Sequence, residues 1–180
     1  IVTSQLTPGA IILLDAGSTA TGTPAALLDI IAQARALGYD FATISSLLAW
    51  EGYYPEEPIL TGPSQLFNQV NTDQKVISLT ISGVSDDTRI DDILQNLASL
   101  DVKATFFIEG STSQAALNKI VASGHEIGNQ ANSGADASGM TADQLKAEII
   151  LTEASAITAG STSKPYFRAP AGVTNDSILN

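Results

Sequence analysis

The sequence has no cysteine and only one histidine, His125. The absence of cysteine excludes disulfide bonds and zinc sites built from thiolates, and a lone histidine cannot supply a typical zinc site. Long apolar runs are also missing. The longest, residues 10–14, is followed at once by Asp15 and Gly17, far short of the about 18 residues that a membrane-spanning helix needs. We therefore predict no membrane span.

Basic residues are scarce. Eight Lys and Arg stand against 19 Asp and Glu, which gives a formal net charge of −11. This charge repels phosphate backbones and anionic lipid surfaces, so nucleic acid and membranes are excluded as partners. The 180 residues are 44% apolar and 15% charged, the balance of a globular chain with one domain or parts of two.

The first part of the chain predicts strand, helix and strand. Residues 10–14 form a continuous apolar run after Pro8-Gly9, which is typical of a strand buried on both faces of a parallel sheet. A helix should follow, with Thr23 as N-cap, Pro24 in its first turn and Gly38 at its end. The next predicted strand covers residues 41–44.

Periodicity is lost between residues 49 and 74. Proline, glycine and acidic residues dominate there, and the adjacent Tyr53 and Tyr54 lie among them. This composition is typical of a linker. The two tyrosines could stack on sugar rings, but in such a linker they more often pack against a neighbouring domain.

After the linker, strands and helices alternate again, which predicts βαβ order and an α/β fold with a parallel sheet or barrel. Thr141 and Gln144 form a Thr-x-x-Gln capping box at the start of the last predicted helix. The predicted strands are residues 76–81, 102–108, 126–128 and 166–168, and the predicted helices are residues 90–100, 114–123 and 141–159.

Four segments in this second part carry a family resemblance: VISLTI at 76–81, VKATFFI at 102–108, GHEIGN at 124–129 and YFRAPAG at 166–172. Their order resembles the first half of the NodB homology domain of polysaccharide deacetylases, carbohydrate esterase family 4. Residues 8–48 resemble the end of the same domain. The resemblance implies a partial, distorted (β/α) barrel in which strands 10–14, 76–81 and 102–108 lie side by side.

The two pieces stand in reversed order, which predicts residues 1–48 as the C-terminal part of one deacetylase-like domain, 49–74 as a linker and 75–180 as the N-terminal part of another. A circular permutant that lacks the central segment of the domain is the alternative. We favour a fragment of a tandem array, because both ends of the chain fall inside predicted elements and not in loops.

The resemblance also implies a chemistry. Family members remove acetyl groups from glycans with zinc or another divalent metal held by one Asp and two His, an Asp as general base and a His as acid. Such a metal polarises the acetyl carbonyl and lowers the pKa of the attacking water. Partners implied by the family are glycans or cell-wall polysaccharides, and neighbouring repeats of the same polypeptide would be further partners.

The motif residues that hold the metal are substituted in this sequence. The Thr-Phe-Asp-Asp-Gly motif aligns on residues 80–84, which places Ser82 at the position of the base and Gly83 at the position of the ligating Asp. The two ligating histidines align on Gln130 and Gly134. We therefore expect no bound metal cofactor.

The remaining motifs are partly retained. The last motif, Leu-x-His, aligns on residues 13–15, so Asp15 replaces the catalytic histidine with a carboxylate that has no proton to donate at neutral pH. The Arg-x-Pro-x-Gly motif is complete, with Arg168, Pro170 and Gly172. Its arginine orients the base in the family, and here we expect Arg168 to be vestigial and to pair with an acidic neighbour.

Three further residues are weaker candidates. His125 is expected to be a structural histidine with satisfied hydrogen bonds. Asp86 and Asp87 could bind a hard cation such as calcium, but their spacing matches no calcium loop.

These substitutions leave three hypotheses for the function. The chain is a catalytically silent deacetylase-like domain that binds glycan or supports an active repeat, a hydrolase with unfamiliar ligands such as Asp15, Asp86 and Asp87, or a structural spacer of a larger surface protein. The family implies a location outside the cell or at its surface.

Overall fold

A computed structural model describes residues 6–17, 19–50, 66–84, 87–162 and 166–172. Strands and helices alternate along this chain, as the sequence predicts. In chain order the elements are β1 (Ile11–Asp15), α1 (Thr23–Ala36), β2 (Asp40–Phe41), α2 (Ile44–Trp50), β3 (Val76–Ser82), α3 (Asp87–Ser99), β4 (Thr105–Ile108), α4 (Gln114–Ala122), β5 (Glu126–Asn129), η2 (Ala137–Gly139), α5 (Ala142–Thr158) and η3 (Pro170–Gly172).

All the strands pair in parallel in the order β1-β3-β4-β5, and the short β2 pairs with the start of β3. Leu13 of β1 lies beside Thr80 of β3, which in turn lies beside Thr105 of β4. The prediction that these three strands lie side by side is therefore confirmed. The sheet does not close within the described residues, so the fold is an α/β sheet of the partial-barrel type.

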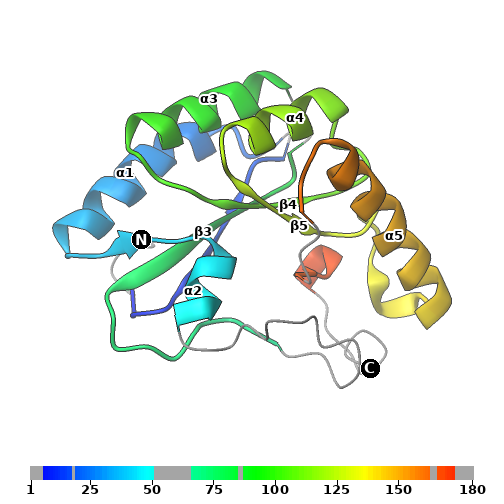
Figure 1. Ribbon diagram of the computed structural model, residues 1–180, viewed down its shortest axis with the longest axis horizontal. Helices are drawn as coiled ribbons and strands as arrows, with labels where there is room; N and C mark the ends of the chain where they lie inside the picture. Colours follow the sequence, from blue (N-terminus) through cyan, green and yellow to red (C-terminus); the bar gives the residue numbers. More distant parts are fainter. Residues whose placement is uncertain (1–5, 18, 51–65, 85–86, 163–165, 173–180) are drawn as a thin grey trace.

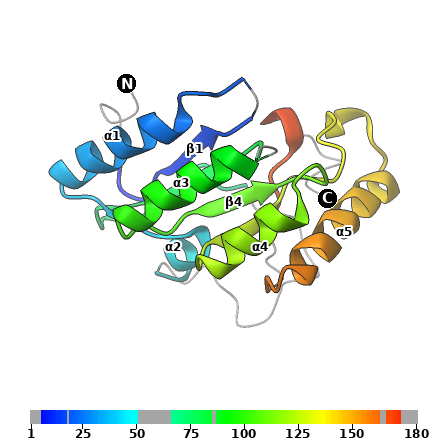
Figure 2. The same ribbon diagram turned by 90° about the horizontal axis from the view of Figure 1, so that it is seen from above.

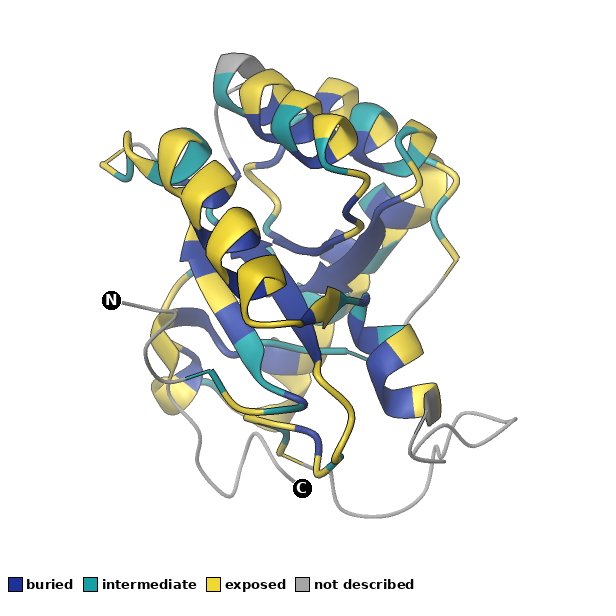
Figure 3. Cartoon of the chain, turned by 90° about the vertical axis from the view of Figure 1, so that its left-hand side faces the viewer, coloured by how far each residue is buried: buried dark blue, intermediate teal, exposed yellow. Residues whose placement is uncertain are grey.

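Helices cover the two faces of the sheet unequally. Helices α1, α3 and α4 lie together over one face, which we call the outer face, while α2 and η3 lie on the other, the inner face (Figures 1 and 2). Each helix buries one side and exposes the other (Figure 3). The larger core lies beneath the outer helices, around fully buried residues such as Leu27, Leu79, Ile93 and Phe106.

The prediction that the first strand is buried on both faces is wrong. Ile12 and Leu14 of β1 pack into the core toward the outer helices, whereas Leu13 is 57% exposed. The reason is that β1 forms the edge of an open sheet, so only its outer face is fully covered. Burial therefore alternates along β1, as in a strand that is covered on one side.

Three other local predictions are also corrected. The N-cap of α1 is Gly22, and Thr23 is the first helical residue, with its hydroxyl donating to the carbonyl of Asp15. The strand expected at 41–44 is limited to Asp40–Phe41, since Ile44 already begins α2. The strand expected at 166–168 is reduced to one bridge between Phe167 and Asn129.

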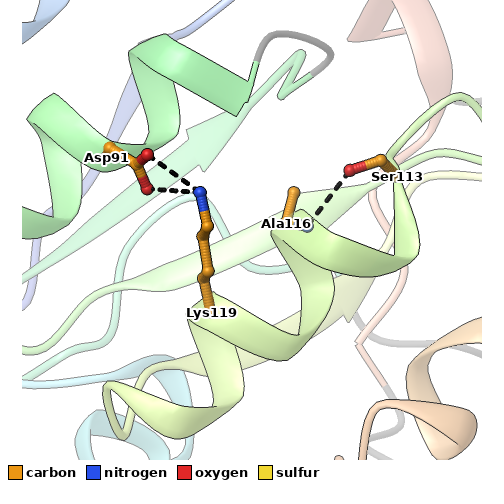
Figure 4. Close-up of polar contacts among 4 residues, drawn as sticks. All are labelled: Asp91, Ser113, Ala116 and Lys119. Carbon is orange, nitrogen blue, oxygen red and sulfur yellow. Dashed lines mark hydrogen bonds and ion pairs between the residues drawn. The ribbon is translucent and has the colours of Figure 1, made fainter.

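Capping and one ion pair define the later helices. The capping box of Thr141 and Gln144 is present at the start of α5, as predicted. Ser113 caps α4 by accepting a hydrogen bond from the backbone N–H of Ala116 at 3.1 Å (Figure 4). Lys119 of α4 reaches Asp91 of α3 at 2.7 Å, which joins these two neighbouring helices at the surface (Figure 4).

The described end of the predicted linker, residues 66–74, packs against the first piece of the chain. Val70 is buried and donates its backbone N–H to the carbonyl of Gly9 at 2.9 Å, next to an isolated antiparallel bridge between Gln69 and Ala10. The domain boundaries at residues 48 and 74 stay predictions. Within the described ranges, none of the helices has the length and hydropathy that a bilayer crossing requires.

Candidate functional site

The motif residues meet at the carboxyl ends of the parallel strands, on the inner face of the sheet. Asp15 at the end of β1 lies beside Ser82 at the end of β3. Glu109 directly follows β4, and Gln130 directly follows β5 and donates its backbone N–H to Ile108 at 2.9 Å. Carboxyl ends of parallel strands are where α/β sheets position ligand-binding side chains. The tertiary structure therefore brings together motif residues from both pieces of the chain.

Arg168 extends across the inner face of β3. Its guanidinium donates to the hydroxyl of Ser82 at 3.0 Å and to the hydroxyl of Thr80 at 2.8 Å. Its central carbon lies 3.9 Å from the ring centroid of Phe107, in a cation–π contact. Burial lowers the pKa of Arg168 to about 10, so the group stays charged at neutral pH. The sequence predicted that Arg168 pairs with an acidic neighbour. In the structure its partners are instead the hydroxyls of Thr80 and Ser82 and the ring of Phe107.

The backbone around Arg168 explains how the side chain reaches this place. The N–H of Arg168 donates to the carbonyl of Asn129 at 2.8 Å, and the N–H of Asn129 donates to Tyr166 at 2.9 Å. Pro170 and Gly172 of the same motif form η3, in which Ala171 and Gly172 have φ of 57° and 69°. The motif loop is thus anchored to the end of β5 and turns sharply over the inner face.

Gly83, at the position of the ligating Asp, lies directly against Asp15. Its φ is +74°, a conformation that side chains other than glycine rarely adopt. A Cβ at this position would lie 2.7 Å from Oδ1 of Asp15 and 2.9 Å from the backbone nitrogen of Gly17. That Oδ1 accepts a hydrogen bond from Gly17 at 2.8 Å, so the carboxylate is held in place. A side chain at this position would therefore meet both the carboxylate of Asp15 and the backbone of Gly17.

Gly134, at the position of one ligating histidine, shows the same relationship with Glu109. Its φ is +64°, and a Cβ would lie 2.8 Å from Oε2 of Glu109. Burial and the negative charge of Asp15 raise the pKa of Glu109 above its ordinary value, while a hydrogen bond with Ser111 lowers it. The effect of Asp15 on this pKa indicates that the two carboxylates share one electrostatic environment.

Gln130, at the other histidine position, is 9% exposed. Its side-chain oxygen is buried and has no hydrogen-bond partner among the described residues. An amide oxygen is a weaker ligand for zinc than an imidazole nitrogen, which zinc sites prefer.

These residues do not fit a metal triad of one carboxylate and two imidazoles. The described residues contain no group of three or more His, Cys, Asp or Glu side chains that could hold a metal ion. Two of the three ligand positions are glycines whose missing side chains would collide with neighbouring atoms. We therefore derive no catalytic step through a metal at this site.

His125 lies at the opposite end of β5, away from the motif residues. Its Nδ1 accepts a hydrogen bond from the N–H of Ala104 at 3.2 Å, and its ring packs edge-on against Phe106. Burial, together with the charge of Lys103, lowers the pKa of His125 to about 4, so the ring is neutral at pH 7.

Several other candidates lie outside what the structure describes. Asp86, Tyr53 and Tyr54 fall outside the described residues, and Asp87 is described only as the first residue of α3. Conversely, sequence reasoning missed Glu109, Thr80 and Phe107. Glu109 comes directly after the predicted strand 102–108, so comparing the residues that follow each predicted strand would have identified it. No pattern in the sequence indicates the contact of Arg168 with Phe107.

The parallel sheet, the motif loop and the strand-end site together define a polysaccharide-deacetylase type of fold. The sequence model of the polysaccharide deacetylase family matches residues 69–180, which is more than half of the chain. The chain therefore belongs to this family, carbohydrate esterase family 4 with its NodB-type domain. No curated protein matches the sequence closely enough to add to this assignment.

Similar solved structures are family 4 proteins. A Bacillus anthracis protein described as a pseudoenzyme of this family has 25% identity and a TM-score of 0.56, over 59% of this chain and 39% of that one. The peptidoglycan deacetylase PdaC from Bacillus subtilis has 27% identity and a TM-score of 0.54, over 61% of this chain and 55% of that one. This chain thus spans only about two fifths to just over half of their lengths.

A third solved structure resembles the chain over almost its whole length. The Streptococcus pyogenes deacetylase PplD, solved with acetate, has a TM-score of 0.70 over 95% of this chain and 78% of that one. Its identity is only 14%, so the likeness shows the fold and no more.

Proposed function

We propose that this chain is a catalytically silent member of the polysaccharide deacetylase family. The observation that carries the proposal is the collision at Gly83, where a Cβ would lie 2.7 Å from Asp15 and 2.9 Å from the backbone of Gly17. The ligand is absent, and the space that its side chain needs is occupied by another side chain and by backbone. This packing is what we expect of a site that no longer binds the metal.

The acid and base positions support the same conclusion. Ser82 has no charge with which to accept a proton, and its hydroxyl already accepts a hydrogen bond from Arg168. Asp15 stands in place of the proton-donating histidine, and its Oδ1 accepts a hydrogen bond from the N–H of Gly17. General acid–base catalysis needs groups whose protonation states change near the working pH, and a serine hydroxyl is not such a group.

A pseudoenzyme has a precedent on this fold. The Bacillus anthracis protein is described as a pseudoenzyme, and a mutant of it is described as having restored activity. These descriptions belong to that protein. For the present chain they support the idea that the family fold persists when activity is lost.

The test combines metal analysis with acetate release. The purified chain is incubated with zinc and desalted, its metal content is measured, and acetate release is followed on acetylated chito-oligosaccharide and acetylated xylan, with an active family member as positive control. We expect substoichiometric zinc and no acetate release above background. Stoichiometric zinc together with acetate release would overturn the proposal and favour the hydrolase with unfamiliar ligands.

The residues that remain at the site favour glycan binding over a purely structural spacer. Asp15 is exposed and Glu109 is partly buried at the same edge of the sheet, and carboxylates accept hydrogen bonds from sugar hydroxyls. Titration of chito-oligosaccharides into the ¹⁵N-labelled chain should shift amide signals near Gly17 and Gly110. Unshifted signals with every glycan tried would support the spacer.

Location outside the cell or at its surface is part of the same proposal, since it follows from the family's glycan substrates. Immunodetection in fractions of the source cells tests this directly. Signal confined to the cytoplasm would contradict it.

A further inference from the structure

A cleft of about 340 Å³ lies along the start of β5, the last strand in the order of the sheet. Four consecutive residues, 124–127, line it. Side chains of consecutive strand residues point to opposite faces, so a cleft that contacts all four follows the edge of the strand and not one face. Its other walls come from Thr43 and Ser45 around the start of α2, and from residues 160–162 after α5.

This edge of β5 carries a pair of backbone groups without partners. The N–H groups of Glu126 and Gln130 donate toward β4, at 3.1 and 2.9 Å. Because hydrogen-bonding groups alternate between the two edges of a strand, the N–H and carbonyl of Ile127 point to the free edge. No described residue bonds either group, although Ile127 is only 5% exposed. Buried backbone groups are almost always paired, so this pair indicates a partner from outside the chain.

Asn129, two residues further along the same edge, shows what such a pair binds. Its N–H donates to the carbonyl of Tyr166 at 2.9 Å, and its carbonyl accepts from the N–H of Arg168 at 2.8 Å. Both bonds come from the two peptide groups that flank Phe167, which forms a parallel bridge with Asn129. Ile127 presents the same donor and acceptor to the cleft.

His125 adds a third polar group to the cleft. Its ring is neutral at pH 7, and its Nδ1 accepts from Ala104, which places the ring proton on Nε2. No described residue accepts from this Nε2–H. Among the described residues, the unpartnered side-chain atoms that the fold seals from solvent are oxygens of Ser78, Gln130 and Glu153. Nε2 of His125 is not one of them, so this donor is open to the cleft although the residue is 8% exposed.

We propose that this cleft binds a short extended peptide segment, which adds a strand to the free edge of β5. A single trans amide has its N–H and carbonyl on opposite sides, so it cannot bond both groups of Ile127, whereas two successive peptide groups can. This geometry favours a peptide over a sugar that carries one acetamido group. A further carbonyl of the peptide accepts from His125. The carboxylate of Glu126 also lines the cleft, so the segment is neutral or basic and not acidic. The cleft lies at the opposite end of the strands from the motif residues, and the inference is independent of the proposed function.

The first test measures amide hydrogen exchange of the chain without peptide. The N–H of Ile127 should exchange about tenfold or more faster than that of Asn129, because only the second is hydrogen-bonded. Equal protection of the two amides would show that the edge at Ile127 is already paired, and this result would overturn the proposal.

The second test titrates acetyl-trialanine methylamide into the ¹⁵N-labelled chain. We expect saturable shifts of the Ile127 amide and of the His125 ring nitrogen, with a dissociation constant on the order of 1 mM. The same peptide with N-methylated internal amides lacks the donors and is the matched control ligand. N-acetylglucosamine, with one amide, should not shift these signals. Absent shifts, or equal shifts with the N-methylated peptide or the sugar, would contradict peptide binding at this edge.

A pair of variants locates the binding. Thr162→Trp places a large ring at an exposed residue that lines the cleft, and it should abolish the shifts. Thr158→Trp, at an exposed residue of α5 that does not line the cleft, is the matched control and should retain them. Circular dichroism shows that both variants are folded. Undiminished peptide shifts in Thr162→Trp would exclude this cleft as the binding site.

Discussion

The carboxylate of Glu126 accepts hydrogen bonds from both the backbone N–H and the hydroxyl of Ser45, which lies 81 residues earlier in the chain. A third donor is the hydroxyl of Thr105 at 2.7 Å. Ser45 belongs to the first turn of α2, so this buried carboxylate satisfies N–H groups that a helix start leaves unpaired. It also joins α2, in the first part of the chain, to β4 and β5 in the second.

Glu126→Gln should therefore destabilise the fold. The glutamine amide has the same size as the carboxylate but no negative charge. Its NH₂ group is a donor, so it cannot accept the hydrogen bonds that Ser45 and Thr105 donate. We expect a loss of about 2 kcal/mol in the free energy of unfolding. Asp29→Asn, at an exposed acid of α1, is the matched control and should change it by less than about 0.5 kcal/mol. Urea denaturation measures both, and equal stabilities of the two variants would contradict the role of Glu126.

Gly83→Ala should destabilise the chain because it combines two costs. The φ of +74° disfavours any Cβ, and the new methyl group would meet Asp15 and Gly17. We expect a loss of about 2 kcal/mol or more. Gly139→Ala is the control, since a Cβ there meets nothing within 4 Å. Equal thermal stability of Gly83→Ala and Gly139→Ala would contradict the claim that Asp15 and Gly17 occupy the space beside Gly83.

Arg168→Ala should cost stability although the residue has no carboxylate to orient. It removes hydrogen bonds to Thr80 and Ser82 and the contact with Phe107, for an expected loss of about 2 kcal/mol. Arg168→Lys should recover only part of this loss, because an ammonium lacks the planar fork. Arg35→Ala, which loses one hydrogen bond and a longer cation–π contact of 5.9 Å with Phe41 at an exposed site, should cost less in the same denaturation experiment.

Stability should depend on pH through His125. Its pKa in the folded chain is about 4, below the ordinary 6.5, so the unfolded chain binds the proton more readily. The stabilisation from the neutral ring is complete above pH 6.5 and is lost as the pH falls toward 4. The shift corresponds to about 3 kcal/mol. His125→Asn retains an acceptor for the N–H of Ala104 and should flatten the profile in this window, whereas a profile equal to that of the unmodified chain would exclude His125 as its source.

Local patterns were sufficient to predict most elements, because the physical signals for them are local. The capping box of Thr141 and Gln144 and the apolar strand 76–81 depend on neighbouring residues, and both are present in the structure. The predicted pairing of strands 10–14 and 76–81 is also present, and it places Asp15 beside Ser82 because parallel strands bring their carboxyl ends to one edge.

By itself the sequence determined the α/β alternation, the deacetylase-type motifs and the loss of the metal-ligand side chains. Only the tertiary structure decided what fills the vacated space, since the contacts of Asp15 with Gly83 and of Glu109 with Gly134 join residues 68 and 25 positions apart. It also decided that Leu13 is exposed, because burial of a strand depends on what lies opposite its faces, and in an open sheet the edge strand has a covering layer on one side only.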